Sequence, residues 1–229
     1  MAALQRALVD ELFARHDDGC CYVDMEPVEN PIDDAARILE LIQTRLPTGG
    51  VICLRPGVYW LRSQLTIAGM SIELRGCPDA VLVSDASGLT PIVVGLNGKL
   101  TLSGLVYCTA SATPGPALIE LGDGASLEVR ECGLFHVGPT AGVLNPGIAV
   151  MTTGAIPSVF NPASQPYEIL YNETPGLPDP LPQTELLELP ARVRLEGCVV
   201  IARWAVAAAT LEALTVHGSV LQCKDGAVC

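Results

Sequence analysis

The segment Ser71-Ile-Glu-Leu-Arg-Gly-Cys77 recurs in altered form four more times along this chain of 229 residues. The related segments are Lys99-Leu-Thr-Leu-Ser-Gly-Leu105, Ser126-Leu-Glu-Val-Arg-Glu-Cys132, Arg192-Val-Arg-Leu-Glu-Gly-Cys198 and Ala213-Leu-Thr-Val-His-Gly-Ser219. Each alternates apolar and polar residues, then continues with a turn residue and a small or apolar one. This period of two is typical of a β-strand with one buried face. The sequence therefore predicts five equivalent strands.

The turn residues of these segments recur every 21 to 28 residues, apart from one gap of 66. A second short strand precedes most of them, as at 92–94, 118–121 and 206–208, with turns at Asn97-Gly98 and Asp123-Gly124. A coil of this length cannot bury its own apolar face and must stack on its neighbours. We therefore predict an all-β solenoid, a parallel β-helix, over residues 48–229.

In such a stack, equivalent apolar residues form inward ladders. One predicted ladder is Ile72, Leu100, Leu127, Val193 and Leu214, and the next is Leu74, Leu102, Val129, Leu195 and Val216. A third inward column follows the turn and contains Cys77, Leu105, Cys132, Cys198 and Ser219. Because Leu105 separates Cys77 from Cys132, we expect no cysteine partner in register and a core-packing role for these thiols.

The first 47 residues read as N-terminal helices and a cap. Leu4, Leu8 and Leu12 indicate an amphipathic helix over 2–15, followed by a strand at 20–23. A second helix is predicted from Asn30 as N-cap to Leu46, with Ile38, Leu41 and Ile42 buried. His16, Cys20 and Cys21 straddle a helix end, which is unsuitable for a metal ion. No metal or cofactor is expected.

The segment Leu46-Pro-Thr-Gly-Gly-Val-Ile-Cys-Leu-Arg-Pro-Gly-Val-Tyr59 is close to the L-P-x-G-G-x-I-x-L-x-P-G-x-Y opening that follows the capping helix in many parallel β-helix proteins. With the coils at 46–137 and 191–229, the chain resembles the pectate-lyase-like right-handed parallel β-helix superfamily. The resemblance implies a right-handed β-helix with an N-terminal α-helical cap. It does not specify chemistry, because the superfamily includes polysaccharide lyases, glycoside hydrolases, phage tailspikes and structural segments.

The charge balance excludes two classes of partner. Thirteen basic and 25 acidic side chains give a net charge of −12, which disfavours nucleic acid and anionic membranes. No apolar run approaches the roughly 20 residues of a membrane span, and the first residues lack the apolar core of a signal peptide. We therefore expect a cytoplasmic location, while export as part of a larger assembly stays open.

The catalytic motifs that this resemblance would imply are largely missing from the sequence. Hydrolases of the fold carry clustered aspartates, Gly-His-Gly and Arg-x-Lys, whereas His217-Gly218 is the nearest fragment here. The predicted outward positions instead pair opposite charges, and Glu128/Arg130 would complement Arg194/Glu196 on a neighbouring strand. This pattern predicts a solvated face of ion pairs. A sugar-binding groove that includes Arg130, Arg194 and His217 is the alternative.

Residues 138–190 break the period, and a Pro-rich lateral loop is predicted at about 152–190. Ten of the 18 prolines lie within 138–190, and Gly147–Met151 suits one more strand. Loops of this length are usually functional or mobile. The aromatic and amide side chains suit sugar stacking or protein recognition, although packing against the sheet is equally compatible. The candidate binding residues are Phe160, Tyr167, Tyr171 and Asn172.

Two functions from different classes follow. The leading hypothesis is a non-catalytic β-helix module, a rigid structural or recognition element for a protein or polysaccharide within a larger chain or assembly. The alternative is a carbohydrate-active enzyme, either a polysaccharide lyase or a glycoside hydrolase. Because nothing after Gly218 resembles a polar cap, we also expect another subunit or further chain to stack on the C-terminal coil.

Overall fold

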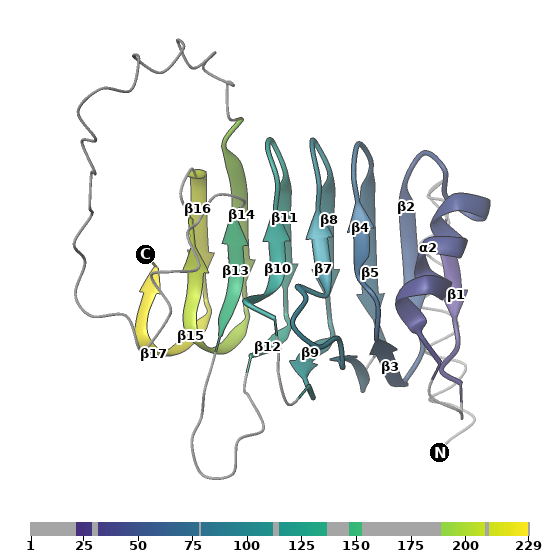
Figure 1. Cartoon of the computed structure of the whole chain (residues 1–229), viewed down its shortest axis with the longest axis horizontal. Coiled ribbons are helices and arrows are strands. Elements are labelled where there is room, and N and C mark those ends of the chain that lie inside the picture. The colour runs from purple at the N-terminus through teal and green to yellow at the C-terminus, as the bar shows by residue number, and fades with distance from the viewer. Residues whose placement is uncertain are drawn as a thin grey trace, which may run out of the picture.

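The computed structural model describes residues 22–28, 32–77, 79–111, 115–136, 147–152, 189–208 and 211–228. In these residues the chain is mostly β-strand, the sheets are parallel, and one α-helix lies at the N-terminal end (Figure 1). The predicted all-β class is confirmed. The amphipathic helix predicted at 2–15 lies outside the described residues.

The strands form two sheets, named here sheet A and sheet B. Sheet A contains, in order, β1 (Tyr22–Met25), β2 (Gly50–Leu54), β5 (Ser71–Gly76), β8 (Lys99–Ser103), β11 (Ser126–Arg130), β14 (Ala191–Glu196) and β16 (Leu211–His217). Sheet B contains β3 (Gly57–Leu61), β6 (Ala80–Ser84), β9 (Val106–Thr109), β12 (Gly133–Phe135), β15 (Val199–Ala207), β13 (Ile148–Thr152), β10 (Ala117–Leu121), β7 (Ile92–Val94) and β4 (Leu65–Ile67), with β17 (Val220–Val228) paired to β15.

The five related sequence segments are neighbours in sheet A. Ser71 pairs with Lys99, Lys99 with Ser126, Ser126 with Arg192, and Arg192 with Ala213, which is the predicted register. Both predicted inward ladders are buried from β5 to β14. At β16, the last strand of the sheet, Val216 is 41% exposed because no described strand follows it.

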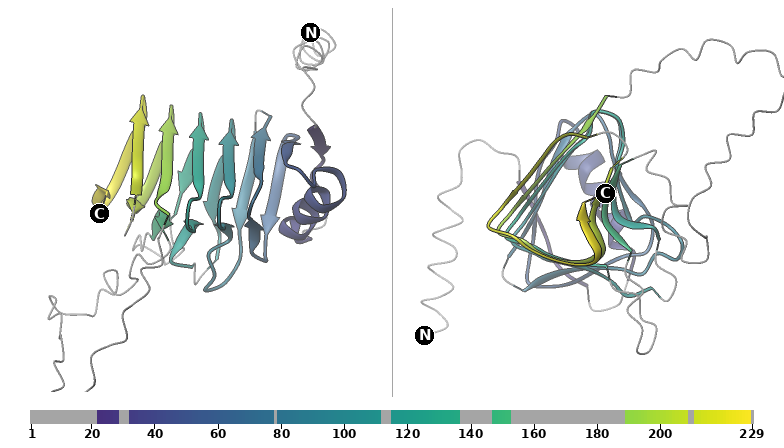
Figure 2. Two further views of the ribbon diagram at one scale, coloured as in Figure 1. Left: turned by 90° about the horizontal axis from the view of Figure 1, so that it is seen from above. Right: turned by 90° about the vertical axis from the view of Figure 1, so that its left-hand side faces the viewer.

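Sheet B consists of two halves joined by the long strand β15. Its first residues, Val199–Ile201, pair with β12, and its last residues pair with β13 through Trp204, Val206 and Ala207. Seen end-on, the strands lie on three sides of a closed outline that surrounds the core (Figure 2). The strand predicted at Gly147–Met151 is confirmed as β13.

The turn position of the repeat is mostly glycine because of the backbone conformation required there. Gly104, Gly197 and Gly218 have φ angles of 63°, 62° and 59°, in the left-handed region that glycine enters without steric cost. Glu131 occupies the equivalent position with φ 53° and is the exception to the glycine pattern. A left-handed residue therefore marks the turn out of sheet A after β8, β11, β14 and β16, whereas Gly76, at the end of β5, lies outside that region.

Helix α2 (Asp34–Arg45) corrects the predicted cap. The helix begins three residues later than predicted from Asn30, because Asp33 is the N-cap and its carboxylate accepts a hydrogen bond from the Ala35 backbone N–H at 3.1 Å. Ile38 and Ile42 are buried as predicted, whereas Leu41 is only partly buried. The strand predicted at 20–23 is observed as β1, which pairs with β2 and extends sheet A.

The predicted column of inward cysteines is buried, but the expectation that no cysteine has another cysteine in register is wrong. Cys77, Cys132 and Cys198 are buried, as predicted, and all are free thiols. However, Cys132 and Cys198 occupy neighbouring strand levels, because Val199 pairs with Gly133 and its N–H donates to the Cys132 carbonyl at 2.9 Å. The long gap in the sequence interrupts the repeat without interrupting the stack.

Candidate functional site

The outward face of sheet A brings together three of the predicted binding residues. Arg130 lies on β11, Arg194 on β14 and His217 on β16, which are consecutive strands. Arg130 pairs in register with Glu196, and Glu196 with His217, so these three side chains share one row. The other predicted binding residues, Phe160, Tyr167, Tyr171 and Asn172, lie outside the described residues.

Glu128 is the centre of an ion-pair network on this face. Its carboxylate lies 2.8 Å from the Arg130 guanidinium and 3.6 Å from that of Arg194 on the next strand. Arg194 also contacts Glu196 at 2.9 Å. Glu128 is buried beneath these partners, while the arginine side chains are about half exposed. The predicted complementarity between the two strands is confirmed.

Other glutamate side chains on this face, beyond both ends of the network, are also paired with arginines. Burial opposes ionisation of Glu73, but hydrogen bonds from Arg75 at 2.8 Å and Ser103 at 2.9 Å outweigh it and hold the pKa of Glu73 below its usual value. Towards the other end, the hydrogen bonds from Arg192 at 2.6 and 2.7 Å lower the pKa of Glu212. These carboxylates therefore stay ionised at neutral pH.

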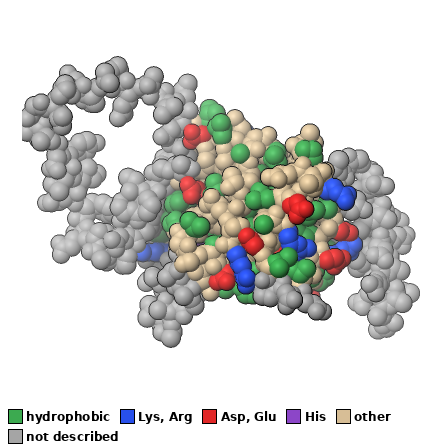
Figure 3. Space-filling view, turned by 45° about the vertical axis from the view of Figure 1, so that its right-hand side comes forward, with side chains coloured by type: hydrophobic (Ala, Val, Ile, Leu, Met, Phe, Trp, Pro, Cys, Tyr) green, Lys and Arg blue, Asp and Glu red, His purple; other side chains and the backbone are tan. Residues whose placement is uncertain are grey.

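The surface charges are intermixed. In the view of Figure 3, acidic and basic side chains lie mostly near one another rather than in separate large patches of one sign. Within the described ranges, no group of three or more His, Cys, Asp or Glu side chains is placed to hold a metal ion. None of the described helical residues forms a span long and apolar enough to cross a membrane.

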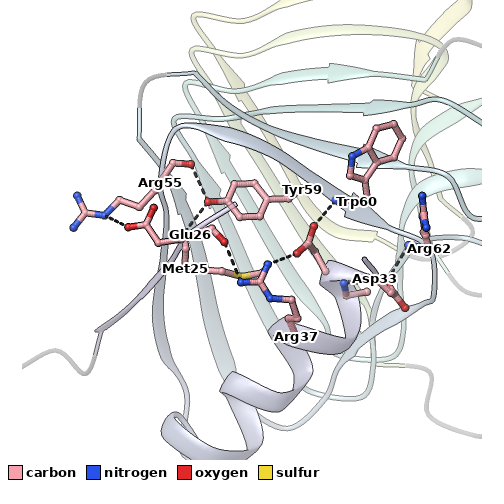
Figure 4. Close-up of polar contacts among 10 residues, drawn as sticks. Met25, Glu26, Asp33, Arg37, Arg55, Tyr59, Trp60 and Arg62 are labelled. Atoms are coloured by element: carbon pink, nitrogen blue, oxygen red, sulfur yellow. Dashed lines mark hydrogen bonds and ion pairs between the residues drawn. The ribbon is translucent and has the colours of Figure 1, made fainter. Parts of the chain in front are cut away.

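A second polar cluster lies between α2 and the first strands (Figure 4). The buried Asp34 carboxylate accepts a hydrogen bond from the backbone N–H of Trp60 at 2.7 Å and pairs with Arg37 at 2.5 Å. The Tyr59 hydroxyl lies 2.6 Å from the Met25 carbonyl, and burial raises the pKa of Tyr59. All of these groups bond to one another or to backbone, so the cluster fastens the cap to sheet B.

His136 is a buried residue that the sequence did not single out. Its Nδ1 accepts a hydrogen bond from the Gly147 N–H at 2.9 Å, so the proton of the neutral ring is on Nε2, which lies 3.1 Å from the Gly115 carbonyl. Burial lowers the pKa of His136. Gly115 and Gly147 precede β10 and β13, so the ring ties the end of β12 to the start of two neighbouring strands. This is a satisfied core histidine.

The sequence analysis also passed over the outward positions of β3, β6, β9, β12, β15 and β17. They are named here the apolar face, because most are Val, Ile, Phe or Trp. The signal was available. Gly57–Leu61, Ala80–Val83 and Val199–Ala202 are apolar without alternation, a pattern that indicates strands apolar on both sides.

We compared the chain with protein families, curated proteins and solved structures. No family model matches it, and no match was found among curated proteins or solved structures.

Proposed function

We propose that this chain is a right-handed parallel β-helix module that serves as a non-catalytic, rigid structural or recognition element. The in-register neighbours of sheet A, the two halves of sheet B and the covering helix α2 support the β-helix architecture. Stacked coils of this kind resist bending because each coil is hydrogen-bonded to its neighbours along its strands.

One observation carries the non-catalytic part of the proposal. On the outward face of sheet A, Glu73, Glu128, Glu196 and Glu212 each lie within 3 Å of an arginine nitrogen. Glycoside hydrolysis needs one carboxyl group that holds a proton near neutral pH beside a second carboxylate. Arginine pairing has the opposite effect, since it favours the ionised form. This face is therefore suited to binding rather than to acid–base chemistry.

The partly exposed arginines of this face indicate the class of ligand. Arg130 and Arg194 are about half exposed and share Glu128. The pair of Arg194 with Glu196 is exposed on both sides, and such pairs contribute only about 0 to 1 kcal/mol, so a carboxylate or sulfate of a ligand can replace Glu196 at little cost. Neighbouring strands place successive side chains about 4.8 Å apart. We propose an extended acidic partner, a polysaccharide or an acidic protein segment, that lies across β11, β14 and β16.

Binding to a glycan panel tests this proposal. The panel contains polygalacturonate, a sulfated glycan and a neutral glycan, each with and without Ca²⁺, and both binding and cleavage are measured. We expect binding to the acidic glycans without cleavage, and at least tenfold weaker binding for Arg130→Ala combined with Arg194→Ala. Arg62→Ala is the matched control, since Arg62 is a half-exposed arginine outside sheet A.

Three outcomes count against the proposal. Reproducible cleavage would replace the module with the enzyme alternative, above all if Glu128→Gln abolished it. Acidic-ligand binding that the double variant leaves intact would move the recognition surface away from sheet A. Failure of every acidic glycan and of a poly-glutamate peptide to bind would leave the rigid structural role without a recognition role.

A further inference from the structure

The four central strands of sheet A carry a local excess of positive charge. Strands β5, β8, β11 and β14 present five basic and three acidic side chains on their outward face, a net charge of +2 in a chain whose total is −12. The basic residues are Arg75, Lys99, Arg130, Arg192 and Arg194, and the acidic ones are Glu73, Glu128 and Glu196. The local charge therefore favours an anionic ligand on this face, although the charge of the whole chain opposes one.

Lys99 differs from the other basic residues of this face. Each arginine of the four strands lies within 3 Å of a carboxylate oxygen. The Lys99 side chain is exposed, and none of the described carboxylates forms an ion pair with it. Glu73 and Glu128, on the two neighbouring strands, are held by Arg75 and Arg130 at 2.8 Å. An anion can therefore bind Lys99 without displacing an existing ion pair.

Two serine hydroxyls flank Lys99. Ser71 on β5 and Ser126 on β11 pair in register with Lys99 from either side, and all three side chains point outward because the residue after each of them is buried. Neither hydroxyl has a hydrogen-bond partner among the described residues, whereas Ser103 donates to Glu73 at 2.9 Å. Neighbouring strands lie about 4.8 Å apart, so the three donors share a row about 10 Å long. This row is named here the Lys99 row.

We propose that the Lys99 row binds a sulfate group of the acidic partner, and that this partner is a sulfated polysaccharide. The inference rests on the proposed function of sheet A and extends the ligand from β11, β14 and β16 to β5 and β8. A sulfate ester has three terminal oxygens, one for each donor of the row, whereas a carboxylate has two. The compact ammonium of Lys99 acts as a point charge and does not need the planar, two-oxygen ligand that suits an arginine.

The amount of charge distinguishes sulfate from phosphate. A phosphate monoester carries about −1.5 to −2 at neutral pH, which one ammonium neutralises only in part. A sulfate ester carries a single negative charge, which Lys99 balances. Because Glu73 and Glu128 lie on the flanking strands, uncompensated charge on the ligand would be repelled.

The cations on consecutive strands favour a ligand with repeated anionic groups. Arg130 on β11 and Arg194 on β14 follow Lys99 on β8, so three neighbouring strands present a basic side chain about every 4.8 Å. A polysaccharide with sulfates along its chain is extended by its own charge repulsion, so it loses less conformational freedom when it binds along this line. A protein segment with one sulfated tyrosine would occupy only the Lys99 row and should bind more weakly.

Three dextrans test the proposal, because they share a backbone and differ in their anionic groups. Dextran sulfate, carboxymethyl-dextran of the same degree of substitution and unsubstituted dextran are titrated calorimetrically into the full chain at about 0.15 M salt. Dextran sulfate should bind most tightly, and unsubstituted dextran should not bind. Lys99→Gln should weaken dextran sulfate binding at least tenfold, whereas Lys99→Arg keeps the charge and most of the affinity. Arg45→Gln is the matched control, because Arg45 is an exposed arginine in the last turn of α2.

Ser71→Ala combined with Ser126→Ala tests the preference for sulfate. Loss of both hydroxyls should weaken dextran sulfate at least tenfold and carboxymethyl-dextran clearly less, because a carboxylate lacks the third acceptor oxygen. The preference of the unaltered chain for dextran sulfate should therefore shrink in this variant. Melting curves followed by circular dichroism show whether each variant keeps the native fold.

The results that would overturn the proposal differ from those that would overturn the proposed function. Dextran sulfate binding that Lys99→Gln leaves intact, but that Arg130→Ala with Arg194→Ala weakens, would keep the acidic ligand on sheet A and remove it from the Lys99 row. Equal binding of carboxymethyl-dextran and dextran sulfate would refute the sulfate preference. Tighter binding of a sulfotyrosine peptide than of dextran sulfate would replace the polysaccharide with a protein. Failure of every polyanion to bind would overturn the recognition role itself.

Discussion

Replacing His136 by glutamine removes one titrating group from the core and keeps a side chain that can donate a hydrogen bond. A glutamine amide can still donate to the Gly115 carbonyl, but it cannot also accept the Gly147 N–H, which bonds to Nδ1 at 2.9 Å in the native chain. An unsatisfied buried N–H costs about 1 to 3 kcal/mol. The free energy of unfolding at pH 7.5 should therefore fall by about that amount.

The pH dependence provides the sharper test. Burial lowers the pKa of His136 in the folded chain, so below its unfolded pKa of about 6.5 the unfolded state binds more protons. The stability contributed by the neutral ring is thus present above about pH 6.5 and is lost as the pH falls towards the folded pKa. The slope is at most about 1.4 kcal/mol per pH unit, or about 2 kcal/mol by pH 5. The deficit of the variant should therefore shrink towards zero at pH 5.

Urea denaturation followed by circular dichroism at several pH values between 5 and 7.5 measures this difference. The range avoids the carboxylates, whose titration below about pH 4.5 adds a second acid-dependent loss. His217→Gln is the matched control, because His217 is exposed on β16, and it should change the stability by less than about 0.5 kcal/mol. Parallel stability curves for His136→Gln and the unaltered chain would show that burial does not lower the pKa of His136 in the folded state.

Three further predictions concern the core, the cap and the ion pairs. Burial raises the pKa of Cys132 to about 12, so at pH 8 iodoacetamide should alkylate Cys132 at least about 100-fold more slowly in the native chain than in urea. Peptide mass mapping measures the two alkylation rates. Ile38→Asp should cost about 4 kcal/mol or more and lower the melting temperature sharply, whereas Glu40→Ala on the exposed side of α2 should not. Glu73→Gln should lower the unfolding free energy by about 1 kcal/mol at pH 7 and by steadily less below about pH 4.3 in urea titrations, because the stability due to the lowered pKa of Glu73 is complete above the unfolded pKa and is lost as the pH falls through the folded pKa.

The strand register of sheet A was predictable because the alternation of apolar and polar residues is compatible with only one pairing of neighbouring strands. A one-residue slip between Leu100 and Leu127 would turn both buried ladders to solvent and the charged residues to the core. The same constraint placed Glu128 beside Arg194, so the ion-pair network was also predictable from the aligned segments.

The apolar face was missed for a related reason. Strands such as Gly57–Leu61 do not alternate, so their outward residues resemble core residues in the sequence, and only the pairing of Val58 with Val81 and onward shows that they form one surface. The N-cap was misassigned because Asn30 and Asp33 are both competent caps. Asp33 also accepts hydrogen bonds from Arg62 and Ser63, thirty residues away in the sequence.

The sequence by itself determined that the chain forms repeated β-strands paired in register, which residues of sheet A face inward, and that its outward carboxylates meet arginines. These properties depend on the period of two and on residues at equivalent places in the repeat. Only the tertiary structure decided that Cys132 and Cys198 are neighbours, that His136 joins β12 to β10 and β13, and that outward positions of β3, β6, β9, β12, β15 and β17 form one apolar face. Those facts depend on contacts between residues far apart in the chain, where local pattern carries no information about distance.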